Sequence, residues 1–230
     1  MRFFDIPDII LDSTRQMFRE LENDPRDSKI DLGIGIYRDE NGLAPVFKAV
    51  KKAEQKLFES ELSKSYKTPS GNSQYCKNIL DLVLGENILK ERSDKIGCIQ
   101  IPGAGSGLRI AGELIKNNSK NKTISIPDPT WGQQTFMFQR AGLKITKHTY
   151  YDQINNFLDF DSMLDDLNKL KSGDALLLHG CCHNPTGADL SEDQWGQVAH
   201  MCLKKGILPF IDLVYQGLGK GIIEDVLGIR

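Results

Sequence analysis

The second half of the chain alternates apolar, strand-like segments with segments of helical periodicity, and this alternation constrains the fold more than any other feature. Residues 174–180 (DALLLHG) and 207–215 (ILPFIDLVY) carry long apolar runs, and an amphipathic segment over 191–206 lies between them. Apolar strands joined through helices are typical of a parallel sheet that helices cover on both faces. The sequence therefore predicts an α/β fold with three layers, α/β/α, around a mostly parallel sheet.

The remaining segments fit the same arrangement. Their periodicity predicts helices at 12–22, 45–59, 160–171 and 191–206, two more helices after PGAGSG and PDPTWG, and strands at 30–37, 97–101, 123–126, 143–151, 174–180 and 207–215. Four irregular segments, PGAGSG, PDPTWG, HGCCHNPTG and DLVYQG, fall at the carboxyl ends of expected strands. Ligands of open α/β sheets bind at this edge, so we expect the functional site there.

Charge and hydropathy exclude several classes of function. The net charge is -2 and no run of five like charges occurs, so the sequence offers no basic surface for nucleic acid. No apolar run approaches the roughly 20 residues that span a bilayer. Asp5 and Asp8 interrupt the apolar N-terminus, which argues against a signal peptide. The five cysteines form no CxxC motif, so we expect reduced thiols and a cytoplasmic protein without nucleic-acid or membrane partners.

The segment HGCCHNPTG admits several interpretations. Its side chains could bind zinc, form a redox or nucleophilic Cys–His pair, or pack behind a strand end. Cys181, Cys182 and His183 are adjacent, so in extended backbone they diverge, and no second pair stands at ligand spacing. Nothing in the sequence predicts a lowered thiol pKa. We expect no metal site here and favour buried thiols.

The segment 103–107, GAGSG, joins an expected strand to an expected helix. Free backbone N–H groups and the positive end of the helix would form an anion-binding site. Leu108 stands where a dinucleotide-binding GxGxxG motif has its last glycine, which weakens the NAD interpretation. A monophosphate site and an ordinary turn both stay open.

Two side chains at strand ends extend this site. Trp131 either covers the core or offers a flat surface for an aromatic ligand. Asp212 lies in an apolar strand, where a carboxylate is either a hydrogen-bonded structural acid or the partner of a protonated heterocycle. Together with the amide of Asn184 and a phosphate site, these groups match one ligand, pyridoxal phosphate.

The order of these segments also resembles a known family. LGIGIYRDENG, VKKAEQKL, PGAGSGLR, DPTW, LLHGCCHNPTG and LPFIDLVYQGLGKG resemble, over nearly all 230 residues, the N-terminal part of class I, fold-type I aminotransferases of the aspartate and aromatic amino acid type. The HNPTG and D-x-x-Y-Q-G segments are the specific ones. The resemblance implies an N-terminal arm at 1–11, the beginning of a small domain at 12–44, and at 45–230 the large domain of a pyridoxal-phosphate-dependent transferase, truncated at its C-terminal side.

The resemblance implies roles around the cofactor ring. Asp212 would keep the ring nitrogen protonated. Asn184 and Tyr215 would bind the phenolic oxygen of the ring. Trp131 would stack on the ring, and with Asn184 and Gly35 it would also lie beside the substrate.

The resemblance also implies how the phosphate is bound. Ala104 and Gly105 would donate backbone N–H groups to it. Tyr66 would reach the phosphate of the neighbouring subunit, so the intact family would act as a homodimer. Gly105 departs from the family pattern, which usually has Thr or Ser there, although Ser106 stands beside it.

Two further departures concern catalysis. Gln134 stands where a histidine usually supports the ring-binding acid. The 230 residues end before the family's S-x-x-K segment, so the Schiff-base lysine and the substrate-binding arginines have no counterpart and no catalytic residue is assigned. Without the segments that follow in the family, strand 97–101 would lose its neighbours and strand 207–213 would become an apolar edge, so we expect poor solubility or a partly molten chain.

The implied function is that of an aminotransferase, which moves an amino group from aspartate or an aromatic amino acid to a 2-oxo acid through pyridoxal phosphate. Two alternatives stay open. The chain could be a non-catalytic remnant that binds pyridoxal phosphate weakly or pairs with an intact subunit. It could also be a nucleotide-binding module built on PGAGSG.

Overall fold

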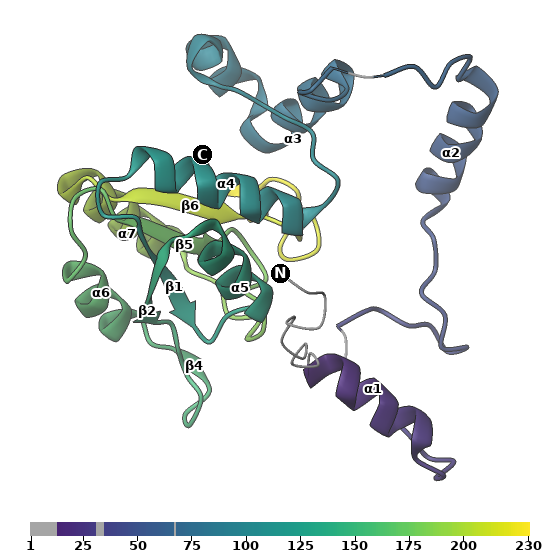
Figure 1. Cartoon of the computed structure of the whole chain (residues 1–230), viewed down its shortest axis with the longest axis horizontal. Helices are drawn as coiled ribbons and strands as arrows, with labels where there is room; N and C mark the ends of the chain where they lie inside the picture. The colour runs from purple at the N-terminus through teal and green to yellow at the C-terminus, as the bar shows by residue number, and fades with distance from the viewer. Residues whose placement is uncertain (1–12, 31–34, 67) are drawn as a thin grey trace, which may run out of the picture. The chain divides into compact units, whose positions relative to one another are not determined.

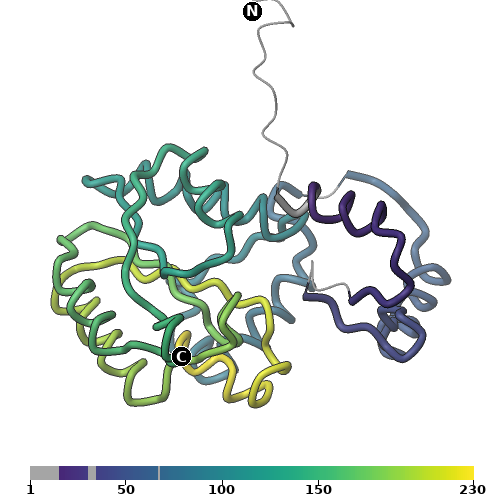
Figure 2. The backbone as a smooth tube through the Cα atoms, turned by 90° about the horizontal axis from the view of Figure 1, so that it is seen from below, coloured from purple at the N-terminus to yellow at the C-terminus, as the bar shows by residue number. Residues whose placement is uncertain are grey.

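The computed structural model describes residues 13–30, 35–66 and 68–230, and the chain divides into two compact units, Met1–Ser65 and Tyr66–Arg230. The expected arm, residues 1–11, lies outside the described residues. The N-terminal unit contains helices α1 (Ser13–Asn23) and α2 (Lys48–Ser60). All other helices and strands belong to the C-terminal unit, which Figure 2 shows in blue to yellow.

The centre of the C-terminal unit is a four-stranded parallel sheet with the strand order β2-β1-β5-β6. Its strands are β1 (Thr123–Asp128), β2 (Lys144–Thr149), β5 (Ala175–His179) and β6 (Leu208–Asp212). Ala175 is paired with Ile124 on one side and with Leu208 on the other, which fixes the register of the three adjacent strands. A short antiparallel pair, β3 (Tyr151–Asp152) and β4 (Phe157–Leu158), lies outside this sheet.

Helices cover both faces of the sheet (Figure 1), as the sequence predicts. Helices α4 (Ala104–Asn118) and α5 (Gly132–Ala141) pack on one face, and α6 (Phe160–Asn168) and α7 (Glu192–Lys205) pack on the other. Strand β5 serves both cores: Leu176 and Leu178 join the α6–α7 side, while Ala175 and Leu177 join the α4–α5 side. Each buried leucine of this kind stabilises the fold by about 1.5–3 kcal/mol.

Helix α3 (Ser73–Arg92), which the sequence analysis did not predict, is followed by the short 3-10 helix η2 (Ser93–Lys95). It is kinked at Gly85, whose φ of 76° suits glycine. Carbonyl groups before the kink accept hydrogen bonds from the end of the chain: Gln216 Nε2 donates to Leu82 O at 3.1 Å and Arg230 Nε donates to Val83 O at 3.0 Å. The kink therefore supplies the acceptors that hold α3 to the C-terminal segment, which includes the 3-10 helix η3 (Glu224–Val226).

One expected strand is wrong, and another falls only partly within the described residues. Residues 97–101 form neither helix nor strand, because no strand in the described part of the chain lies beside them to share a hydrogen-bond ladder. Of the strand expected at 30–37, residues 31–34 lie outside the described residues and 35–37 form no strand. By contrast, the helix expected at 191–206 is present as α7, and a capping box begins it: Gln194 N donates to Ser191 Oγ, and Ser191 N donates to Gln194 Oε1 at 2.8 Å.

Candidate functional site

The carboxyl ends of three adjacent strands bring most of the expected site residues to one edge of the sheet. Strands β1, β5 and β6 are parallel neighbours, so the segments that follow them begin at the same edge. Trp131 follows β1, Asn184 follows β5, and Tyr215 follows Asp212, the last residue of β6. All four side chains are partly buried.

The first turn of α4 lies near this edge as well. A Cβ at Gly105 would be 3.5 Å from Met137 Cε, and one at Gly112 would be 2.7 Å from Ala141 Cβ, so α4 and α5 run in the same direction. Helix α5 begins just after β1, and α4 therefore also begins at the carboxyl edge. Gly103, the N-cap of α4, has a φ of 112° and no side chain to cap the helix, which leaves the N–H groups of Ala104 and Gly105 accessible to an anion.

A chain of hydrogen bonds connects Asp212 with the segment that carries Asn184. Gln134, fully buried on α5, donates through Nε2 to Asp212 Oδ2 at 2.7 Å. His179 Nε2 lies 3.0 Å from Gln134 Oε1, and Asn184 N donates to His179 Nδ1 at 3.1 Å. The hydroxyl of Thr130 also donates to Gln134 Oε1. These hydrogen bonds thus connect the beginning of α5, the end of β5 and the end of β6 through side chains.

The donors in this chain fix the protonation of His179. A backbone N–H only donates, so the Nδ1 that faces Asn184 N carries no hydrogen and Nε2 carries the single imidazole proton. Burial lowers the pKa of His179, although the nearby carboxylates of Asp212 and Asp189 act in the opposite direction. A neutral His179 therefore matches both its burial and its two partners.

Three polar groups at the edge remain available for a ligand. The Asp212 Oδ1 atom, the side-chain amide of Asn184 and the Tyr215 hydroxyl make no hydrogen bond with any residue that the structure describes. These groups are an acid, an amide and a phenol. They fit a protonated ring nitrogen and a phenolic oxygen on the same ring, the groups that pyridoxal phosphate presents.

Behind Asn184, aromatic packing explains the histidines of HGCCHNPTG. His183 is buried between Tyr150 and His179, with ring centroids 3.9 Å and 4.4 Å away. Burial lowers the pKa of His183 to about 3. Burial also raises the pKa of the Cys181 thiol to about 12, so it is no thiolate nucleophile. No three metal-ligating side chains come together within 13–30, 35–66 and 68–230.

Three further residues that the sequence placed in or beside the site are Ser106, Tyr66 and Gly35. Ser106, which stands beside the expected phosphate ligands, donates its hydroxyl to Gly103 O at 3.2 Å. Tyr66 is exposed at the beginning of the C-terminal unit, and Gly35 is exposed in the N-terminal unit. The roles of Tyr66 and Gly35 stay predictions.

Sequence reasoning missed the residues that support the site from behind. It identified Gln134 as a departure from a family pattern, whereas the structure makes it the hydrogen-bond donor of Asp212. It also missed Asp189, whose carboxylate accepts from Cys182 N at 2.8 Å and from His183 N at 3.0 Å. The acid that follows PTG in HGCCHNPTGAD was the available signal, because Asp often closes a turn through backbone N–H groups.

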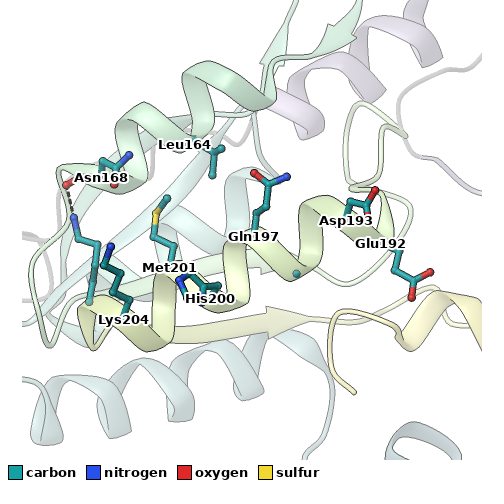
Figure 3. Close-up of a pocket in the computed structure, with 10 residues that line it drawn as sticks. Leu164, Asn168, Glu192, Asp193, Gln197, His200, Met201 and Lys204 are labelled. Carbon is teal, nitrogen blue, oxygen red and sulfur yellow. Dashed lines mark hydrogen bonds between the residues drawn. The ribbon is translucent and has the colours of Figure 1, made fainter.

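A separate groove of about 930 Å³ lies between α6 and α7, away from these residues (Figure 3). Leu164 and Met201 form its apolar part, and Glu192 and Asp193 lie toward one end. The Nζ of Lys205 donates to the carbonyl of Asn168 across the other end. None of the expected site residues lines the groove, so its volume does not mark the cofactor site.

Comparison with known proteins identifies the class. The sequence model of the family "Aminotransferase class I and II" matches residues 27–227. The chain therefore belongs to the class I and II aminotransferase family, as its resemblance predicts. No helix in the described part of the chain combines the length and apolar character that a membrane span requires.

Individual relatives agree with this assignment. The chain is 40% identical over 209 residues to the aspartate aminotransferase of Haemophilus influenzae, covering 91% of this chain and 53% of the relative. It is 42% identical over 211 residues to the aromatic-amino-acid aminotransferase of Pseudomonas aeruginosa, covering 90% and 52%. The solved structure of the aromatic-amino-acid aminotransferase from Burkholderia pseudomallei, covalently bound to pyridoxal phosphate, matches with a TM-score of 0.94 at 31% identity, covering 100% of this chain and 58% of that one. The chain spans about half the length of the curated relatives it matches.

Proposed function

We propose that these 230 residues bind pyridoxal phosphate at the carboxyl edge of the sheet and form the cofactor-holding part of an aminotransferase. The observation that supports the proposal is the series of hydrogen bonds from Asp212 through Gln134 and His179 to Asn184. It fixes an acid and a turn that bears an amide, and it leaves Asp212 Oδ1 and the Asn184 side chain available to a ligand.

Each residue has a distinct task in this proposal. Bound pyridoxal phosphate supplies an electron-withdrawing ring through which an amino group passes between substrates. Asp212 Oδ1 would accept a hydrogen bond from the protonated ring nitrogen and hold that proton in place, since an ion pair there favours the charged ring. Asn184 and Tyr215 orient the ring through its phenolic oxygen. Trp131 excludes water from one ring face.

The phosphate end uses backbone groups. The N–H groups of Ala104 and Gly105 and the positive end of α4 bind the phosphate oxygens. Tyr66 completes this end from the neighbouring subunit of a homodimer, and Gly35 lies beside the substrate. These two contributions belong to the assembled protein.

The reaction of the whole protein is proposed from its family. In the whole protein an amino acid, either aspartate or an aromatic one, would be the amino-group donor and a 2-oxo acid the acceptor, and the bound cofactor would supply the chemistry of the transfer. We assign no residue of these 230 as the lysine that carries the proton, and we expect the chain by itself to bind the cofactor without turnover.

Calorimetric titration of the chain with pyridoxal phosphate tests the proposal. We expect measurable binding that D212N weakens by about tenfold or more, the effect of losing one charged hydrogen bond. D193N, a change of the same chemistry on an exposed residue of α7, should leave the Kd unchanged. Equal affinities of D212N and the unaltered chain would refute the proposed site. Uniformly weak binding together with mixed dimers with an intact relative would instead support a non-catalytic remnant.

A further inference from the structure

In the loop after β6, residues 215–221, four backbone N–H groups donate to one carboxylate, that of Asp225. We infer that Asp225 is a positioning residue, which fixes this loop so that Tyr215 reaches the phenolic oxygen of the cofactor ring. The inference rests on the proposed function, because it concerns how one of the proposed cofactor ligands is placed.

Four backbone N–H groups converge on Asp225. Its Oδ2 accepts from Gly217 N at 2.8 Å and Gly219 N at 3.0 Å. Its Oδ1 accepts from Lys220 N at 2.8 Å and Gly221 N at 3.4 Å. Both oxygens are thus used within the loop, in contrast to those of Asp212, so Asp225 has a supporting rather than a ligand-binding arrangement.

The electrostatics of Asp225 agree with this arrangement. Its side chain belongs to a residue that is only 4% exposed, and burial by itself raises the pKa of the carboxyl. The backbone N–H groups of Lys220, Gly219, Gly217 and Gly221 outweigh burial and lower the pKa. Asp225 is therefore a buried carboxylate whose charge is balanced by the loop, and the loop in turn depends on that charge.

The clamped loop includes the turn that begins at Tyr215. Leu218 N donates to Tyr215 O at 2.9 Å, and the next residue, Gly219, donates to Asp225. Gly217 adopts a φ of 87°, a conformation that suits glycine, and glycine loses more conformational freedom than any other residue when it is held in one conformation. Fixing the N–H groups on both sides of Leu218 therefore fixes the backbone of Tyr215.

The same clamp contacts the turn that carries Asn184. A Cβ at Gly219 would be 2.7 Å from Asp225 Oδ1 and 3.0 Å from Cys182 Sγ, so the two loops meet closely at Gly219. Cys182 N is itself held by Asp189. Asp189 thus holds the turn that bears Asn184, and Asp225 holds the loop that follows Tyr215. Asn184 and Tyr215 are the two proposed ligands of the phenolic oxygen.

The experiment compares the full chain with D225N, Y215F and the double variant D225N/Y215F by calorimetric titration with pyridoxal 5′-phosphate. Y215F should raise the Kd about three- to tenfold, the effect of one hydrogen bond. D225N should raise the Kd by a similar factor. The Kd of the double variant should not exceed the larger of the two single-variant Kd values, because both substitutions remove the same contact of Tyr215 with the cofactor. The control E224Q, a neighbouring exposed acid, should bind like the unaltered chain. Unchanged binding by D225N, or factors that multiply in the double variant, would overturn the inference.

Hydrogen exchange without ligand separates this inference from the proposed function. In D225N one carboxylate oxygen becomes an NH₂ group that accepts no hydrogen bond, so either Gly217 and Gly219 or Lys220 and Gly221 lose the acceptor of their N–H groups. The amides of the affected pair should exchange about tenfold faster or more, while the amides of β5 keep their rates. Equal rates in the loop would overturn the clamp even where the cofactor binds. Failure of the unaltered chain to bind pyridoxal phosphate, with faster loop exchange in D225N, would instead refute the proposed function and leave the clamp supported. Should D225N not fold by circular dichroism, G219A displaces the carboxylate without changing its charge, and the same outcomes apply to it.

Discussion

Gln134 Nε2 lies 2.7 Å from Asp212 Oδ2, and this contact joins a fully buried amide to the acid at the end of β6. A primary amide donates a hydrogen bond at every pH, whereas an imidazole donates from a given nitrogen only in some protonation states. The family pattern places a histidine at this position. In this protein the hydrogen bond that Asp212 accepts from Gln134 therefore does not depend on pH through the donor.

Replacement of Gln134 by leucine should destabilise the chain by about 1–3 kcal/mol, because Asp212 loses a donor and His179 Nε2 loses its acceptor in a buried setting. Gln139 is exposed on the same helix, so Q139L should change the free energy of unfolding by less than about 0.5 kcal/mol. Urea unfolding measures both. Equal stability of the two variants would show that the hydrogen-bond chain contributes nothing.

Acid should destabilise the chain through two buried histidines. Burial lowers the pKa of His148 and of His183 to about 3, from the ordinary value of 6.5 that each regains on unfolding. Between about pH 6.5 and pH 3 only the unfolded chain binds these protons, so stability is complete above this window and is lost as the pH falls through it, by about 1 kcal/mol per pH unit for each histidine.

Urea unfolding at pH 7 and pH 5 measures this dependence, and H148Q removes one of the two protons involved. We expect H148Q to lose about half of the difference that the histidines contribute. His200 is exposed on α7, so H200Q serves as the control and should keep the full difference. An undiminished difference in H148Q would contradict the assignment of the effect to His148.

The close approach of α4 and α5 should make Gly112 intolerant of a methyl group. A Cβ there would be 2.7 Å from Ala141 Cβ and 3.1 Å from Phe138 Cδ1, so G112A should destabilise by about 1–3 kcal/mol through overpacking. Gly196 on α7 has no heavy atom within 4 Å of its added Cβ, and G196A should stabilise by about 0.5–1 kcal/mol through helix propensity. Thermal unfolding that ranked the two variants in the opposite order would contradict this packing.

Strand β6 ends the described sheet, and its outer edge should promote self-association. Leu208 is 50% exposed there, and a lysine on an edge strand opposes strand pairing between chains. L208K should therefore reduce light scattering of the purified chain. Leu203, 85% exposed on α7, provides the control L203K, which adds the same charge away from the edge. Equal reductions by the two variants would assign the effect to net charge.

The sequence predicted those elements whose local pattern agrees with their burial. The apolar run at 174–180 and the helical periodicity of 191–206 led to β5 and α7 in this way. The strand expected at 97–101 is wrong, because a strand also depends on a neighbouring strand, and periodicity carries no information about that neighbour. Helix α3 was missed because its apolar residues follow no clear stripe across the kink at Gly85.

The sequence predicted which residues would gather at the edge of the sheet, but not the residues that support them. Trp131, Asn184 and Asp212 stand at strand ends, and parallel strands bring such ends together. The contacts of Gln134 with Asp212 and of Asp225 with the loop at Gly219 join residues whose pairing depends on side-chain direction and distance in the folded chain. No spacing rule in the sequence specifies these pairs.

Strand β5 is paired on both edges and covered on both faces, so its amides are the ones that only the rarest and largest openings expose to solvent. His179 is its final residue, and the turn bearing Asn184 begins immediately after it. The turn that bears Asn184 therefore begins at the end of a strand that is protected on all sides, so openings that fray the outer strands leave the start of this turn in place.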